Sequence, residues 1–234
     1  TGGELLRILV NHPNATIAFV HSKSKAGKFI HEVHTDLIGD TELKFTSELS
    51  SDIDVMFLCV GHGEAKVFLA ENKIDSKTKI IDLSQDHRLK STTFVYGLPE
   101  LNKEQIKKAN YIANPGCFAT CIQLGLLPLA ANGLLKDDVH ITATTGSTGA
   151  GQSLSTTSHF SWRQNNLSIY KAFEHQHLNE IGQSLTKLQK GFSNDLNFIP
   201  YRGAFTRGII ASLYTNCELS IEKIEELYKS YYSG

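Results

Sequence analysis

Apolar and polar positions along the first half of the chain predict strands and helices in alternation. Residues 3–10 repeat apolar positions at helical spacing, and the short apolar runs 15–20 and 54–60 are typical of strands. A second helix is predicted over 64–73 and another buried strand over 79–83. Strands that are almost entirely apolar need cover on both faces, so this rhythm indicates a mostly parallel sheet flanked by helices.

The rhythm changes after residue 116. The elements predicted beyond it are helices over 117–131 and 175–189, strands over 139–145 and 209–214, and a last helix with Ser220 as its N-cap. Pro128 should bend or end the first of these helices. Strands and helices no longer alternate strictly, which indicates a separate α+β domain. We therefore predict an α/β protein with a Rossmann-like domain over 1–116 and a second domain over 117–234.

The start of the chain is unusual for a nucleotide-binding fold, because such domains open with a strand and a glycine turn before the first helix. Here T-G-G leads directly into a helix, so we expect the first strand to be missing. Thr1 and Gly2 would then end the phosphate-binding turn. The next strand leads to Lys23 between Ser22 and Ser24, with no acid to hold the ribose of NAD. This set suits the extra phosphate of NADP, although an exposed polar loop has the same composition.

A second candidate for the cofactor is the G-x-G segment at Gly61, His62 and Gly63, with Asp82 about 20 residues later. The third glycine of the dinucleotide fingerprint is absent, because Lys66 stands in its place. A plain strand-to-helix turn would give the same pattern.

Composition narrows the class of protein further. The 234 residues are 41% hydrophobic and carry a formal charge of 23 − 24 = −1. This balance leaves no electrostatic footprint for nucleic acid or an anionic membrane. No apolar run approaches the roughly 20 residues that span a bilayer. The four cysteines are too few and too irregularly spaced for a disulfide framework, so we expect a soluble, reduced, cytoplasmic protein.

Candidate chemistry centres on Cys117. The preceding Pro115 and Gly116 break a strand ending at Ala113, and an apolar helix begins at the cysteine. A helix N-terminus favours an anion, so we expect a lowered thiol pKa and N–H groups able to stabilise an oxyanion. Buried packing is the commoner fate of a lone cysteine, but the Pro-Gly turn favours a nucleophile. Cys121 lies one helical turn further on and is expected to pack.

A nucleophilic cysteine needs a partner for proton transfer. His175 and His177 open the amphipathic helix over 175–189, where a side chain can point into a cleft. Two residues apart on a helix, these histidines diverge, and no other ligand has suitable spacing, so no metal site is predicted. The segment T-G-S-T-G-A-G offers N–H groups and hydroxyls to a phosphate. We assign Ser147 to substrate binding and Gly149 to cofactor binding. An ordinary glycine turn would give the same sequence pattern.

Together these segments resemble the N-acetyl-gamma-glutamyl-phosphate reductases, NADP-dependent enzymes of arginine biosynthesis related to aspartate-semialdehyde dehydrogenases. The resemblance covers essentially the whole chain. It rests on six segments in the expected order: T-G-G-E-L-L-R-I-L at the start, Y-G-L-P-E-L at 96–101, A-N-P-G-C-F-A-T around Cys117, G-S-T-G-A-G at 146–151, H-Q-H-L-N-E-I at 175–181 and T-R-G-I at 206–209.

The resemblance implies roles for individual residues. Cys117 matches the family's nucleophile and His175 its general base, while Arg88 and Arg207 match arginines of the substrate and phosphate region; His177 is assigned to substrate with them. Family members usually have a small residue in place of Cys121 and D-F-R in place of D-H-R at 86–88. They also extend beyond this chain at both ends, which puts cofactor binding by this length of chain in doubt.

The implied reaction is reductive dephosphorylation of N-acetylglutamyl 5-phosphate by NADPH through a cysteine thioester. The implied partners are small molecules, namely the acyl phosphate, the semialdehyde and phosphate, with assembly as a homodimer or homotetramer. Three alternatives stay open from the residues. These are an aspartate-semialdehyde dehydrogenase, a hydrolytic or acyl-transfer cysteine enzyme, and a non-catalytic nucleotide-binding module.

Overall fold

A computed structural model describes residues 1–151 and 153–233, which fall into two compact units. Unit 1 comprises Thr1–Asp86 and Asn110–Ile112, and unit 2 comprises His87–Ala109 and Ala113–Gly234. The division therefore puts His87–Ala109 with the second unit, whereas the predicted boundary put it in the first domain. The predicted second domain also includes Gln152 and Gly234, which lie outside the described residues.

Unit 1 consists of short strands and helices in alternation. Its elements are α1 (Gly2–Val10), β1 (Val20–His21), α2 (Ile30–Val33), the 3-10 turn η1 (Thr35–Leu37), β2 (Phe45–Thr46), β3 (Val55–Leu58), α3 (Glu64–Glu71), β4 (Lys79–Asp82) and most of β6 (Tyr111–Ala113). β1 pairs with β2 and β3 with β4, both in parallel, and β6 lies next to β4. The predicted strand over 15–20 is thus reduced to its end, because residues 15–19, all described, pair with no strand.

The first helix packs on the 30–37 segment through a small apolar core and through a hydrogen-bonded ion pair between Arg7 and Asp36. The core consists of Leu6, Ile30, Leu37 and Phe45. Gly3 permits close packing here, since a Cβ at this position would come within 2.6 Å of the His34 ring and would displace it. Arg7 hydrogen-bonds Asp36, which lowers the pKa of that carboxyl to about 2. A loop segment with little regular structure is thereby fixed against α1.

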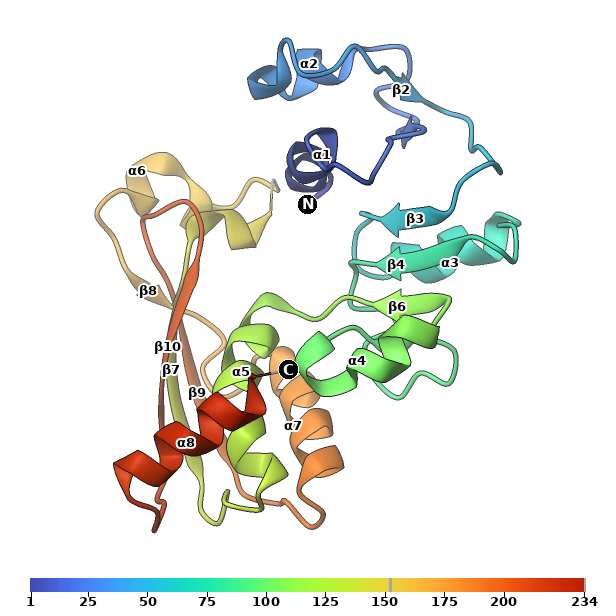
Figure 1. The fold of residues 1–234 in the computed structure, drawn as a ribbon. Helices are drawn as coiled ribbons and strands as arrows, with labels where there is room; N and C mark the ends of the chain where they lie inside the picture. The colour runs from blue at the N-terminus through green and yellow to red at the C-terminus, as the bar shows by residue number, and fades with distance from the viewer. Residues whose placement is uncertain (152, 234) are drawn as a thin grey trace. The chain divides into compact units, whose positions relative to one another are not determined.

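Unit 2 is built on a four-stranded sheet with helices packed against it (Figure 1). Its elements are β5 (Val95–Tyr96), α4 (Pro99–Lys108), α5 (Cys117–Ala131), β7 (Val139–Thr145), η2 (Ser147–Ala150), η3 (Thr156–Ser158), α6 (Phe160–Arg163), β8 (Ser168–Ile169), α7 (His177–Leu188), β9 (Leu196–Arg202), β10 (Ile209–Tyr214) and α8 (Ile221–Tyr231). The strand order is β10-β7-β9-β8, and only β7 and β9 are parallel. Strands of mixed direction confirm the predicted α+β character.

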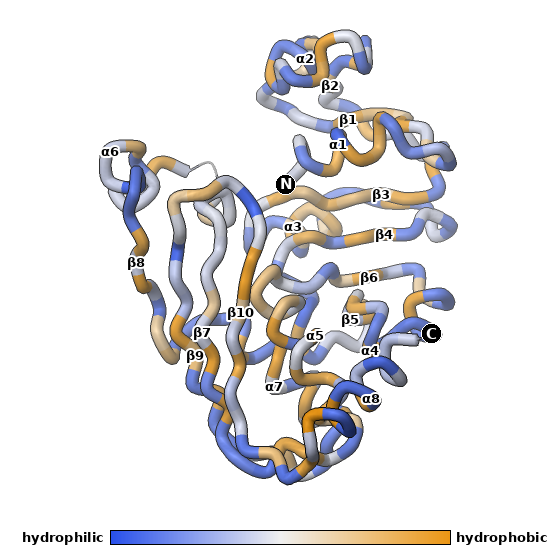
Figure 2. The backbone as a smooth tube through the Cα atoms, turned by 60° about the vertical axis from the view of Figure 1, so that its left-hand side comes forward, coloured by the Kyte–Doolittle hydropathy of each residue, from blue (hydrophilic) through white to orange (hydrophobic). Residues whose placement is uncertain are grey.

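The core of unit 2 lies between this sheet and the helices α5 and α7. Alternate residues of β7, Val139, Ile141 and Ala143, are buried, as expected for a strand with one covered face. They pack with Phe118 of α5 and Ile181 of α7 in one apolar cluster. Figure 2 shows α5 as apolar over most of its length, which agrees with its being covered on several sides.

The sequence predicted α5, β7 and β10 with the bounds observed but missed β9. Pro200 lies in the middle of this strand, opposite Ala143 of β7, and its carbonyl accepts a hydrogen bond from the N–H of Tyr170. Proline argues against an interior strand because it cannot donate to a ladder. At Pro200 the strand supplies an acceptor only.

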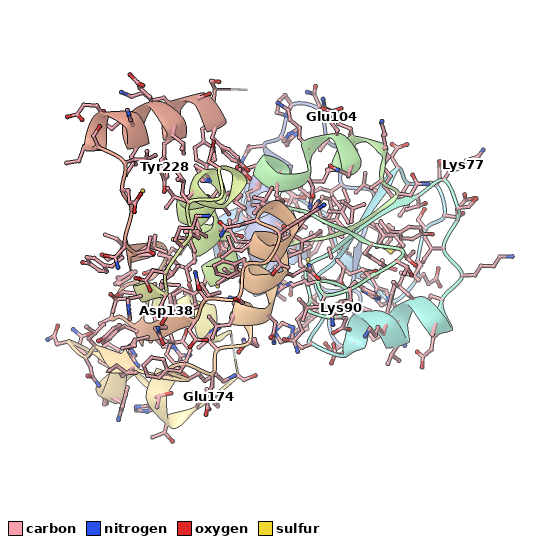
Figure 3. All side chains as sticks on the ribbon, turned by 90° about the horizontal axis from the view of Figure 1, so that it is seen from below. Lys77, Lys90, Glu104, Asp138, Glu174 and Tyr228 are labelled. Carbon is pink, nitrogen blue, oxygen red and sulfur yellow. The ribbon has the colours of Figure 1, made fainter. Side chains whose placement is uncertain are left out.

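Pro128 does not end α5, which continues to Ala131. Proline has no N–H to donate to the carbonyl one turn back, that of Leu124. The hydroxyl of Tyr232, just past α8, donates to this carbonyl, and the hydroxyl of Tyr228 donates to the neighbouring carbonyl of Gly125. In Figure 3, Tyr228 extends from α8 toward α5. The predicted N-cap Ser220 is confirmed, with its Oγ accepting from the N–H of Lys223.

Candidate active site

The turn from β6 into α5 puts Cys117 at the first position of the helix, as the sequence predicted. Gly116 is the N-cap residue, in an extended conformation, and Cys117 is exposed. The backbone N–H groups of Cys117 and Phe118 hydrogen-bond its sulfur. The donors of the first helical turn therefore face the position where a thiolate would carry its charge.

These donors do not lower the pKa of the thiol overall. Although Cys117 is open to solvent, the protein atoms crowded around its sulfur remove water, and this desolvation raises the pKa above the ordinary thiol value. The two N–H groups and the charge of Arg88 act in the opposite direction, whereas the charge of Glu180 acts with desolvation. The predicted lowering of the pKa is therefore wrong, and the thiol needs a base to ionise at neutral pH.

His175 has the properties of such a base. It is 4% exposed, and burial, followed by the nearby charges of His177 and Lys171, lowers its pKa to about 4. Its Nδ1 accepts a hydrogen bond of 3.2 Å from the backbone N–H of His177, so the proton of the neutral ring resides on Nε2. The ring lies edge-on to Phe118, the residue after the nucleophile, with centroids 5.3 Å apart. The structure thus brings both predicted catalytic residues into unit 2.

A buried carboxylate holds this region together and was not singled out from the sequence. Glu180 is 3% exposed and accepts hydrogen bonds from Arg88 Nη1 at 3.1 Å, from the Tyr96 hydroxyl at 2.9 Å and from the Gly116 N–H at 2.9 Å. Burial raises the pKa of Tyr96, which therefore stays protonated and donates. The signal available in the sequence was an acid beside Ile181 on the apolar side of an amphipathic helix.

Arg88, predicted to hold substrate, is 7% exposed and lies behind the catalytic turn. Its Nε donates to the carbonyl of Asn114 at 2.8 Å, and its Nη1 donates to Glu180. It therefore fixes both sides of the turn before Cys117. Arg207 is exposed, on the loop that follows β9.

The glycine-rich segment is joined to that same loop. A Cβ on Gly146 would come within 2.6 Å of the Thr206 carbonyl oxygen, so only glycine permits this approach. The N–H and the hydroxyl of Ser147 both donate to the carbonyl of Phe205, at 2.8 and 3.2 Å. The N–H of Gly149 donates within the turn, to Gly146. These donors serve loop-to-loop contacts, and anion binding by Ser147 and Gly149 stays a prediction.

Two of the three places in unit 1 that were assigned to cofactor lie near its start. Thr1 is the N-cap residue of α1, with Gly2 as the first helical residue. Ser22 follows β1, and Lys23 and Ser24 are exposed beside it. An exposed ammonium between two hydroxyls, with no acid among them, fits a phosphate-bearing dinucleotide.

The other predicted cofactor segment uses its donors within the protein. The N–H of Gly61 donates to the Glu64 side chain at 2.9 Å, and His62 Nδ1 accepts from the Gln85 N–H at 3.2 Å. At the start of α3 the N–H groups of Gly63, Ala65 and Lys66 all donate to the carboxylate of Asp86. This helix N-terminus already holds an anion, one that the chain itself supplies.

Two features are absent from the described residues. Within 1–151 and 153–233, no three His, Cys, Asp or Glu side chains are grouped so as to hold a metal ion. Among the helices of that same part of the chain, none has the length and apolar character needed to cross a membrane.

Comparison with known families and proteins yields matches along the whole chain. Residues 117–234 match the family model described as semialdehyde dehydrogenase, dimerisation domain, and residues 1–109 match semialdehyde dehydrogenase, NAD binding domain. The chain is 58% identical over 234 residues to the N-acetyl-gamma-glutamyl-phosphate reductase of Christiangramia forsetii, covering 99% of this chain and 73% of that protein. It is 59% identical to the same-named protein of Flavobacterium johnsoniae, covering 100% and 74% respectively.

Solved structures resemble the fold at much lower identity. Aspartate semialdehyde dehydrogenase II from Vibrio cholerae matches with a TM-score of 0.70 at 16% identity, over 97% of this chain and 74% of that one. The Candida albicans aspartate semialdehyde dehydrogenase, solved with NADP, matches with a TM-score of 0.66 at 14% identity. The match covers 97% of this chain and 72% of that one. These likenesses support the predicted pairing of a nucleotide-binding domain with an α+β domain.

Proposed function

The chain belongs to the N-acetyl-gamma-glutamyl-phosphate reductases, enzymes of arginine biosynthesis, and on this premise we propose that it forms a thioester on Cys117 and reduces it to a semialdehyde. The substrate is N-acetylglutamyl 5-phosphate and the product N-acetylglutamate 5-semialdehyde. The observation that carries the proposal is a cysteine at the start of α5, followed by Phe118, whose ring packs edge-on against the neutral imidazole of His175. Reduction of an aspartyl phosphate is not favoured, because the relatives at 58–59% identity carry the glutamyl name.

In the first half-reaction the sulfur of Cys117 loses its proton and attacks the acyl carbon. The bond from that carbon to the phosphate oxygen breaks, and phosphate leaves with the electron pair, so the product on the enzyme is a thioester. The raised pKa of Cys117 makes deprotonation the demanding part of this step. His175 is neutral at pH 7 and carries its proton on Nε2, so the atom that accepts the thiol proton is Nδ1, once the hydrogen bond from the His177 N–H opens.

In the second half-reaction NADPH, when bound, supplies hydride to the thioester carbon. The resulting oxyanion would lie by the first N–H groups of α5, and His175, which now also carries the proton taken from Cys117, can donate its Nε2–H to the oxygen. Return of that proton to His175 accompanies cleavage of the carbon–sulfur bond, which releases the aldehyde and regenerates the thiolate. Proton transfer by a positioned side chain such as histidine typically increases the reaction rate by about 10²- to 10⁴-fold.

The choice of NADP over NAD rests on the Ser22-Lys23-Ser24 segment, with Thr1 and Gly2 of the same unit at the phosphate-binding turn. Arg88, Arg207, Ser147 and His177 complete the proposed substrate site. We place the enzyme in the cytoplasm, as a homodimer or homotetramer assembled through its second domain.

The test is phosphate-dependent reduction of NADP with N-acetylglutamate 5-semialdehyde, followed at the nicotinamide absorbance band in the full-length protein. Turnover that requires both phosphate and NADP is expected, with NAD a poor replacement. Turnover without phosphate would point to a hydrolytic aldehyde dehydrogenase. Equal turnover with aspartate semialdehyde would contradict the glutamyl substrate.

A further inference from the structure

Arg202 stands out because no acid in the described part of the chain is paired with its charge. It ends β9 and is half-buried, and its Nε is shielded from solvent without any hydrogen-bond partner. Its guanidinium hydrogen-bonds Tyr170, a neutral side chain. No carboxylate within the described ranges 1–151 and 153–233 forms an ion pair with it. Buried donors are nearly always satisfied in proteins, so an open one on a charged group calls for an explanation.

A second arginine beside it increases the local charge. Arg163 is 6% exposed, and its guanidinium donates to the carbonyls of Thr157, Asn166 and Arg202 and to the hydroxyl of Ser168. All of these acceptors are neutral. Burial, and then the charge of Arg202, lowers the pKa of Arg163. Two guanidinium groups in partly desolvated surroundings, with no acid between them, favour an anionic ligand.

The position of Arg202 relates this charge to the catalytic residues. Its Cζ lies 4.6 Å from the centroid of the Tyr170 ring. That ring lies 5.8 Å from the ring of His175 and 6.5 Å from that of Phe118, the residue after Cys117. One aromatic ring therefore separates the guanidinium from the proposed general acid and base.

We propose that Arg202 binds a carboxylate of the substrate, with Arg163 as a positioning residue that fixes its backbone carbonyl. The inference rests on the proposed function, because the ligand is taken to be the acyl compound that reacts at Cys117. In a glutamyl group the reacting carbon and the α-carboxylate are separated by four carbon–carbon bonds of about 1.5 Å. An extended chain of four such bonds spans about 5 Å, close to each of the two distances measured from the Tyr170 centroid, 4.6 Å to Arg202 Cζ and 5.8 Å to the His175 ring. A guanidinium fork matches a carboxylate better than a point charge does.

The alternative arginine for this role is less suited to it. Arg88 already donates to Glu180 and to the Asn114 carbonyl, so its donors serve the turn before Cys117. Arg202 has an unused donor, and only the Tyr170 ring separates its guanidinium from His175. The carboxylate it takes can come from the α-carbon or from an N-acyl group that itself ends in an acid. Both sources present the same chemistry to the guanidinium.

The experiment measures binding of three unreactive probes by calorimetry to the full-length protein. N-acetylglutamine has only the α-carboxylate, 4-acetamidobutanamide has none, and a third probe carries its sole carboxylate at the end of the N-acyl group. In the wild type, the carboxylate from the correct source should strengthen binding by about 10- to 100-fold over the uncharged probe. Arg202→Gln should abolish that preference, and Arg202→Lys should restore part of it. Lys190→Gln removes an exposed charge after α7 and should change nothing.

Preference for the α-carboxylate or for the acyl carboxylate supports the proposal and identifies the source. The proposal is overturned if the wild type favours neither acid, or if Arg202→Gln retains the preference. In turnover, Arg202→Gln should raise the semialdehyde KM by a similar factor and leave the phosphate KM unchanged; a change confined to phosphate would also overturn it. Wild-type binding without phosphate-dependent turnover would refute the proposed function and leave the carboxylate site standing.

Discussion

Two helices of this chain begin after a glycine turn, and their first N–H groups are used in opposite ways. At α3 the N–H groups of Gly63, Ala65 and Lys66 converge on the carboxylate of Asp86. At α5 the N–H groups of Cys117 and Phe118 converge on the sulfur of Cys117, while Glu180 takes the N–H of Gly116. Both starts looked like anion sites in the sequence. The comparison teaches that a helix N-terminus serves as a site only where no distant acid of the chain has already filled it.

The strongest test of the α5 side is Cys117→Ser. Losing the thiol should reduce kcat in the semialdehyde assay by about 10³-fold or more, because covalent catalysis stops. NADP affinity, measured by fluorescence titration, should be retained. Cys121→Ser, one turn along the same helix, serves as the control and should keep near-normal activity. More than about a hundredth of the wild-type rate in Cys117→Ser would refute the thioester route.

The next test removes the acid behind the catalytic turn. Glu180→Ala removes the carboxylate that pairs with the buried Arg88 and leaves the Gly116 N–H without this acceptor. The free energy of unfolding should fall by about 3–5 kcal/mol, as when one member of a buried ion pair is removed. Urea denaturation measures this loss. Glu174→Ala, an exposed acid labelled in Figure 3, is the control and should be within about 0.5 kcal/mol of wild type.

A smaller effect is expected at the start of α3. Asp86→Ala removes the acceptor of three backbone N–H groups and should cost about 0.5–2 kcal/mol, the usual range for a lost helix cap. Asp40→Ala removes an exposed acid of the same unit and should be nearly neutral. An unchanged unfolding midpoint in Asp86→Ala would mean that solvent satisfies this helix start as well as the carboxylate does.

The finest test concerns the pH dependence of the thiol. Because desolvation raises the pKa of Cys117, alkylation by iodoacetamide should still accelerate above pH 8.5, where an ordinary thiol is half ionised. Mass spectrometry of the Cys117 peptide follows the rate from pH 6 to 10. A rate that levels off below about pH 7.5 would instead show that the α5 N–H groups outweigh desolvation.

Local features were predictable from the sequence, and long-range partners were not. The Pro-Gly turn and the apolar run after it were enough to place Cys117 at the start of α5, because both signals lie within a few residues of the cysteine. Glu180 lies 64 residues from Gly116 and 92 from Arg88, so nothing local shows that they meet. The direction of the Cys117 pKa shift was missed for the same reason: desolvation depends on which side chains gather around the sulfur. Strand β9 was missed because Pro200 argues locally against a strand. The strands that pair with it, β7 and β8, lie elsewhere in the sequence and give no local signal.

The proline within α5 links two positions that a sequence comparison would treat as unrelated. Pro128 leaves a carbonyl of the helix without its usual donor, and the Tyr232 hydroxyl takes that donor's place. A homologue with an ordinary helix former at 128 has no such vacancy, and a phenylalanine at 232 would then cost it little. The two positions should therefore change together over evolution, and their covariation would report how α8 is attached to α5.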